Sequence, residues 1–207
     1  IDGLAPVSFD ELETISVTDT TTPPLTLAVT VNGTNADNDI TVIGTGANAF
    51  TVSVDGGPAV SFAGANALTV HGMSGDDDIE VDVNGLALSS IAIHGDPNPG
   101  SAGLQDSLTV RGVDGGPDND NLIWEPTGVG AGNLQVGAQV LGANPIVVSG
   151  VEALVYDGES QDETPEVRGA GRFVHTPGAN RDAGAVQLDN WLAISYLNLG
   201  LAGTVSV

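Results

Sequence analysis

The sequence predicts an all-β protein, organised as a β-solenoid rod of the parallel β-helix type. Three observations support this. A unit of apolar residue, any residue, apolar residue, any residue and glycine recurs six times, and such alternation before a turn residue is typical of a half-buried strand. Successive glycines of the first five units lie 23, 16, 23 and 17 residues apart, which suits one coil of a solenoid. No segment shows a convincing helical period.

The expected strands follow one another along the whole chain, and their apolar residues supply the core. Apolar residues make up 41% of the sequence and aromatic residues only 4%, so this core is built mainly from Val, Leu, Ile and Ala. An antiparallel β-sandwich remains the alternative architecture, because strands at short regular spacing predict it too. The six units are Val29/Val31/Gly33, Val52/Val54/Gly56, Leu68/Val70/Gly72, Ile91/Ile93/Gly95, Leu108/Val110/Gly112 and Leu154/Tyr156/Gly158.

A longer repeat divides the chain. The pattern of Ile1–Phe9 returns at offsets of 53 and 139, and a fourth copy begins at Leu188 and runs to Val207. A chain that begins and ends on equivalent motifs is expected to be one module of a tandem array. We therefore expect a terminal repeat strand segment at 1–19 that acts as a joint between modules, an extended linker at 20–25, and a repetitive β module at 26–207.

The charge balance limits the partners. The formal net charge is −23, from 27 acidic residues against four arginines and no lysine, so the surface repels nucleic acid and anionic lipid. No apolar run of 18 residues is present, which argues against a membrane span. Bound divalent cations, high external salt and simple solvation all remain open as explanations of the acidity. With no cysteine, no disulfide stabilises the fold.

Short acidic loops follow four of the repeated glycines. The loop from Gly72 to Ile79 aligns without gaps on the loop from Gly33 to Ile40. Carboxylates on glycine-rich turns suit calcium, which takes six to eight oxygen ligands. Turn formation by Asp and Asn alone is the competing interpretation. The candidate calcium ligands are Asp37, Asp39, Asp76, Asp77, Asp78, Asp118, Asp120 and Asp162.

The loop at Gly72 also resembles the calcium-binding nonapeptide of hemolysin-type repeat proteins. The match covers Gly72, Gly75, Asp77 and Ile79, with Met73 in place of the second glycine. In that family, successive nonapeptides stack and share ions between turns. Here the motif occurs singly, a coil or more apart, which puts the stacked ions in doubt.

Three segments together resemble repeat modules of very large surface proteins of planctomycetes and other environmental bacteria. They are Leu68–Val81 (LTVHGMSGDDDIEV), Gly150–Gly158 (GVEALVYDG) and Arg172–Gly178 (RFVHTPG). The resemblance implies an extracellular or cell-surface location, a β-rich fold and a role in the cell envelope, a matrix or a filament. It implies no enzymatic activity.

The residues themselves argue against an enzyme. A polysaccharide lyase needs a cationic group near its base, and the chain has no lysine and only scattered arginines. No Ser-His-Asp arrangement, zinc spacing or phosphate loop is recognisable. His71 and His94 both precede a turn glycine, so we expect them at one repeated outward position, as exposed strand residues rather than as a metal site. We therefore predict no catalytic residues and no organic cofactor.

The function that these features favour is structural. We expect an extracellular module whose strands stack into a rod and whose partners are copies of itself or adjacent repeats, joined end to end through Ile1–Val17 and Leu188–Val207. The alternative is a calcium-dependent adhesion or glycan-binding module. That alternative requires an exposed aromatic platform beside the acidic turns, for which few aromatic residues are present. They are Trp124, Trp191, Tyr156, Tyr196 and four phenylalanines.

Overall fold

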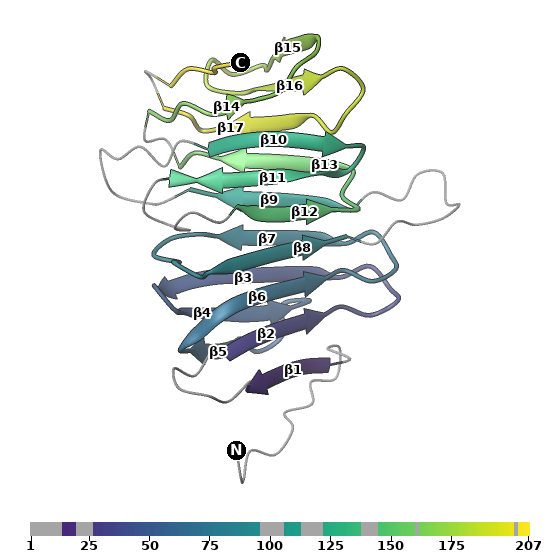
Figure 1. Ribbon diagram of the computed structural model, residues 1–207, viewed down its shortest axis with the longest axis vertical. Helices are drawn as coiled ribbons and strands as arrows, with labels where there is room; N and C mark the ends of the chain where they lie inside the picture. The colour runs from purple at the N-terminus through teal and green to yellow at the C-terminus, as the bar shows by residue number, and fades with distance from the viewer. Residues whose placement is uncertain are drawn as a thin grey trace.

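The computed structural model describes residues 27–95, 106–112, 122–137, 145–159, 162–200 and 203–207, and the backbone of residues 14–19 (Figure 1). This part of the chain is all-β, as the sequence predicts. It contains 17 strands in two mixed sheets, one of eight strands and one of nine. No helix within it is long and apolar enough to cross a membrane.

The strands lie across the long axis of the molecule and follow one another along it (Figure 1). The eight-stranded sheet has the order β1 (Thr14–Asp19), β2 (Leu27–Asn32), β6 (Ala65–His71), β8 (Ser90–His94), β12 (Ile146–Ser149), β11 (Ala131–Val136), β10 (Leu122–Gly128) and β14 (Glu166–Val167). The nine-stranded sheet has the order β15 (Phe173–Pro177), β16 (Gly184–Leu188), β17 (Ile194–Leu197), β13 (Ala153–Asp157), β9 (Ser107–Arg111), β7 (Asp78–Asp82), β3 (Asp39–Gly46), β4 (Ala49–Val54) and β5 (Val60–Ala63).

The chain alternates between the two sheets. It passes from the eight-stranded to the nine-stranded sheet at β2–β3, β6–β7, β8–β9 and β12–β13. Strands β2, β6, β8 and β12 pair in parallel, and so do β3, β7, β9, β13 and β17. Each passage therefore adds one strand to each sheet in the same direction, as successive coils do.

Antiparallel hairpins interrupt this regular alternation. The pairs β4–β5, β10–β11 and β15–β16 each add two antiparallel strands to one sheet. The sheets are consequently mixed, and the described strands do not form a closed solenoid. The antiparallel sandwich is wrong for the central strands, because their pairs are parallel.

The core lies between the sheets and is formed by rows of branched aliphatic side chains. In one row Val29, Leu68, Ile91 and Ile146 lie side by side on β2, β6, β8 and β12, and all are at most 2% exposed. A comparable row crosses seven of the nine strands of the other sheet and consists of Val54, Ile40, Ile79, Leu108, Leu154, Ile194 and Val186. Because burial of one such side chain contributes about 1.5–3 kcal/mol, these rows account for most of the stabilisation. The large aromatic Trp124 is buried too, and its indole N–H donates to the Leu192 carbonyl oxygen at 3.4 Å.

The six strand units predicted from the sequence are confirmed. Each is a strand in the structure, and both apolar residues of each unit are buried. The alternation predicts these strands correctly because it is a local property of a half-buried strand.

The longer repeat does not correspond to a structural repeat. In the copy at offset 53 the two strands are β5 and β6, which lie in the nine-stranded and then the eight-stranded sheet. In the copy at offset 139 they are β12 and β13, in the opposite order. Alternating apolar strands look alike in either sheet, so the similarity carried no information about position. Of the expected segment 1–19, β1 pairs antiparallel with β2 over six residues, and the expected linker 20–25 lies outside the described residues.

Candidate functional site

The acidic turns stack on one another where the chain leaves the eight-stranded sheet. A buried glycine directly follows each of the strands β2, β6 and β8, namely Gly33, Gly72 and Gly95. The Gly33 N–H donates to the His71 carbonyl oxygen at 2.8 Å, and the Gly72 N–H donates to that of His94 at 2.8 Å. The turns are therefore hydrogen-bonded to one another beyond the ends of the strands.

A ladder of polar side chains runs through this stack. The Asp77 carboxylate accepts a hydrogen bond from the Asn38 N–H at 2.8 Å. The Asp106 carboxylate accepts one from the Asp77 N–H at 2.9 Å. The Glu152 carboxylate in turn accepts one from the Asp106 N–H at 2.9 Å. Asn38, Asp77 and Asp106 are at most 5% exposed. Each acceptor thus satisfies a backbone donor of the preceding turn, which a buried N–H requires.

The structure brings four of the predicted calcium ligands close together. Asp37 accepts the Asp76 N–H at 2.9 Å, so their two turns are adjacent. Asp39 and Asp78 are register partners on β3 and β7. Asp77 differs from these four, because it is buried and accepts a hydrogen bond within the stack.

The remaining candidates do not join this group. Asp162 packs against Gly200 near the C-terminal end of the molecule, and Asp118 and Asp120 lie outside the described residues. Within the described residues no three His, Asp or Glu side chains are placed so that they could hold a metal ion. In the structure the carboxylates of the acidic turns accept hydrogen bonds between neighbouring coils.

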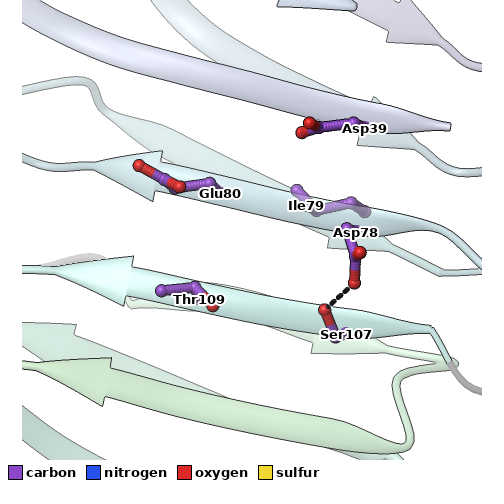
Figure 2. Close-up of a pocket in the computed structure, with 6 residues that line it drawn as sticks. All are labelled: Asp39, Asp78, Ile79, Glu80, Ser107 and Thr109. Atoms are coloured by element: carbon purple, nitrogen blue, oxygen red, sulfur yellow. Dashed lines mark hydrogen bonds between the residues drawn. The ribbon is translucent and has the colours of Figure 1, made fainter. Parts of the chain in front are cut away.

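A shallow polar groove of about 320 Å³ opens on the outer face of the nine-stranded sheet (Figure 2). Its floor comes from β3, β7 and β9, and the Ser107 hydroxyl donates to the Asp78 carboxylate across two of these strands. The lining residues are Asp39, Asp78, Ile79, Glu80, Ser107 and Thr109. The groove is acidic and holds no aromatic side chain, so it lacks the platform expected of a glycan site.

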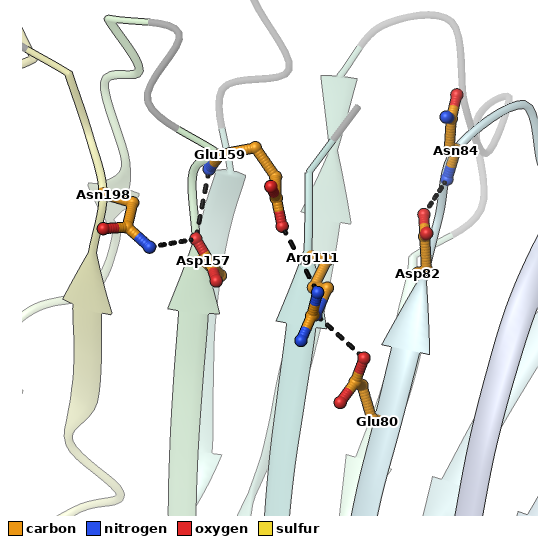
Figure 3. Close-up of polar contacts among 7 residues, drawn as sticks. All are labelled: Glu80, Asp82, Asn84, Arg111, Asp157, Glu159 and Asn198. Atoms are coloured by element: carbon orange, nitrogen blue, oxygen red, sulfur yellow. Dashed lines mark hydrogen bonds and ion pairs between the residues drawn. The ribbon is translucent and has the colours of Figure 1, made fainter. Parts of the chain in front are cut away.

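Polar contacts also connect the strands at their far ends (Figure 3). Arg111 on β9 pairs with Glu80 on β7 at 2.8 Å and with Glu159, which follows β13, at 3.7 Å. The Asn198 amide donates to Asp157 at 2.9 Å and connects β13 to the end of β17. Exposed pairs of this kind contribute about 0–1 kcal/mol each, so they help to define the register more than they stabilise the fold.

His71 and His94 lie at one repeated outward position, as the sequence predicts. His71 and His94 are register partners on β6 and β8, and their rings stack with centroids 4.8 Å apart. His94 Nδ1 lies 2.7 Å from the Ser149 hydroxyl on the next strand, which extends the same outward row. His175 Nε2 lies 2.6 Å from the Tyr196 hydroxyl, and burial raises the pKa of that tyrosine.

The aromatic residues are mostly in the core. Trp124 and Tyr156 are fully buried, Tyr196 is 6% exposed, and Trp191 is half-buried. The aromatic platform that the adhesion alternative requires is therefore not found among the residues that the structure describes.

Sequence reasoning missed the ladder, although a signal for it is present. Asn38, Asp77, Asp106 and Glu152 each stand two residues before the first buried apolar residue of the following strand. Because side chains alternate between the two faces of a strand, a side chain at this position points to the same side as the core residues. The adjacent Asp78 has the opposite parity and is exposed.

Comparisons with known proteins identify no relatives. No family model, curated protein or solved structure matches this chain.

Proposed function

We propose that this chain is a structural, extracellular and non-enzymatic module of a cell-surface, matrix or filament assembly, in which copies or adjacent repeats join end to end. The proposal treats the alternating strands as the coils of a solenoid-like rod. Its first support is the shared register of the central parallel strands, which adds one strand to each sheet per passage of the chain, as in the coils of a solenoid.

The observation that carries the proposal is the incomplete burial of the core at its two ends. The hydrophobic residues that pack on the core but stay partly exposed are Leu27 and Phe62 at one end, and Phe173 and Val205 at the other. Their strands or segments lie at or next to the outer edges of the two sheets. Apposed ends would bury this surface, and open sheet edges are places where strands of another chain can add.

Sedimentation velocity over a range of protein concentrations, combined with negative-stain electron microscopy, tests this function. We expect elongated oligomers whose length increases with concentration, and more so in added salt, which screens repulsion between copies of net charge −23. A chain that sediments as a monomer at every protein and salt concentration contradicts the proposal. Sideways association into sheets would contradict the end-to-end part of it.

We also propose that calcium ions stabilise this module. The acidic turns alone support this proposal. Millimolar calcium chloride should then raise the midpoint of thermal unfolding more than sodium chloride of equal ionic strength. A free calcium concentration 100-fold above the dissociation constant stabilises a single site by about 2.7 kcal/mol. Equal shifts in the two salts would show general screening of the acidic surface, and calcium would then have no part in the function.

A further inference from the structure

Asparagine stands directly before glycine at two places in the chain, and the structure gives these two places different surroundings. They are Asn32–Gly33 and Asn84–Gly85, and a valine precedes both. The asparagine amide of such a pair is open to attack by the next backbone nitrogen, because glycine has no side chain that shields this nitrogen. The same chemistry can therefore be compared in two settings within one molecule.

The first pair is enclosed in the stack of coils. Asn32 is the last residue of β2 and pairs with His71 on β6. Gly33 is buried, and its N–H donates a hydrogen bond to the His71 carbonyl oxygen at 2.8 Å. This nitrogen can react only after its hydrogen bond breaks, and that requires local opening of the stack.

The second pair lies in the turn between β7 and β8 (Figure 3). Asn84 and Gly85 are both exposed, and the Asn84 side chain points away from the end of β7. No other residue in the described part of the chain forms a hydrogen bond with the Gly85 N–H or with the Asn84 side-chain amide. Both reacting groups are therefore accessible in the folded protein, without any opening of the stack.

Hydrogen bonds on both sides of this pair keep it at the surface. The Asn84 N–H donates to the Asp82 carboxylate at 2.9 Å, and the Leu86 N–H donates to the Val83 carbonyl oxygen at 3.0 Å. Gly85 has a φ of 71°, a conformation that glycine adopts without steric cost. Val83 and Leu86 are fully buried, so the turn is anchored in the core while the pair between them faces solvent.

We propose that Asn84–Gly85 is a site of spontaneous deamidation in the folded protein and that Asn32–Gly33 is protected from this reaction. The Gly85 nitrogen attacks the side-chain carbon Cγ of Asn84, an N–Cγ bond forms, and the Cγ–Nδ2 bond breaks. Ammonia leaves with the proton of the Gly85 N–H, and a cyclic imide remains. Water then opens the imide on either side to give aspartate or isoaspartate, and nothing is oxidised or reduced. The inference does not depend on the proposed structural function.

The two products differ in what they do to the turn. Both add a negative charge beside Asp82, but only isoaspartate inserts a further carbon atom into the backbone at residue 84. The Asn84 carbonyl oxygen lies so close to β3 that a Cβ added to Gly44 would be 2.3 Å from it. A lengthened backbone therefore has no room to shift toward β3, and we expect isoaspartate to loosen this contact.

Mass spectrometry of the folded chain after incubation at mildly alkaline pH tests the site. The protein is digested with pepsin, because trypsin leaves both asparagines on the peptide that ends at Arg111. We expect the peptide that contains Asn84 to gain about 1 Da at least about tenfold faster than the peptide that contains Asn32, since reaction at Asn32 requires local opening. Equal rates at the two sites, or a faster reaction at Asn32, would overturn the proposal.

Two controls show whether the fold is the cause of the difference. In guanidinium chloride both pairs are unprotected, so we expect their rates to agree within about threefold. A difference that persists in the unfolded chain would assign it to the local sequence and contradict the protection of Asn32 by the fold. Asn84→Gln should abolish the early mass gain, because the longer side chain has to form a larger ring. A gain that remains in this variant would place the reaction at another residue.

The variant Asn84→Asp separates the added charge from the change in the backbone. Its midpoint of thermal unfolding should lie within about 2 °C of that of the unmodified chain, because residue 84 is exposed. The isoaspartate product, separated by ion-exchange chromatography from the incubated protein, should unfold at a lower temperature than this variant. An isoaspartate product as stable as Asn84→Asp would contradict the expected loosening of the turn.

Discussion

Replacing Asp77 with alanine should destabilise the protein by about 3 kcal/mol. Asp77 is fully buried, and its carboxylate accepts the Asn38 N–H at 2.8 Å. Removing a charged acceptor leaves a buried backbone donor unsatisfied, which costs about 1–3 kcal/mol beyond the hydrogen bond itself. For a chain of this size, such a loss lowers the unfolding midpoint by about 6–12 °C. Thermal unfolding followed by far-ultraviolet circular dichroism measures the change.

Two matched variants separate this role from the effect of charge. Asp77→Asn keeps an oxygen that accepts the N–H, and asparagine already stands at the equivalent position 38, so we expect a loss below about 1 kcal/mol. Asp78→Ala removes the same charge from the exposed neighbouring residue and should change stability by about 0.5 kcal/mol or less. If Asp78→Ala is as damaging as Asp77→Ala, the hydrogen-bond ladder is not the reason for the loss.

The ladder also explains which part of the acidic turns could be read from the sequence. Composition makes Asp76, Asp77 and Asp78 alike candidates for calcium, because it does not distinguish the members of the run. The alternation of side chains between the two faces of a strand does distinguish them. Asp77 points to the same face as Ile79 and Val81 and is buried with them. A polar residue that precedes a strand and points to the core face therefore indicates a side chain that accepts a hydrogen bond from a backbone N–H.

The strand positions were predictable and the strand partners were not. Units such as Val29/Val31/Gly33 indicate a strand through local alternation, so the all-β class and the six strands were predicted correctly. The antiparallel hairpins β10–β11 and β15–β16 were not, because pairing depends on contacts between residues distant in the sequence. The edge position of β15 was missed for the same reason.

Replacing Gly72 with alanine should cost about 2–3 kcal/mol. The backbone of Gly72 approaches the ladder so closely that an added Cβ would lie 2.5 Å from Asp77 Oδ2 and 3.1 Å from its Cβ and Cγ. Asp77 cannot move away without breaking its hydrogen bond to the Asn38 N–H, so the methyl group overpacks the turn. Gly128→Ala is the control, because an added Cβ there meets no atom within 4 Å, and its stability should be unchanged or slightly raised. Urea unfolding measures both.

The combination of the two substitutions decides whether this contact is the cause. Asp77→Ala removes the carboxylate that a methyl group added at position 72 would meet, so Gly72→Ala should cost at least about 1 kcal/mol less in that background than alone. Strictly additive losses would mean that Gly72 is required for another reason, such as the path of its backbone. Coupling of the expected size would show that the close turns and the buried carboxylates form one structural unit, and that the acidic residues of this unit serve the fold.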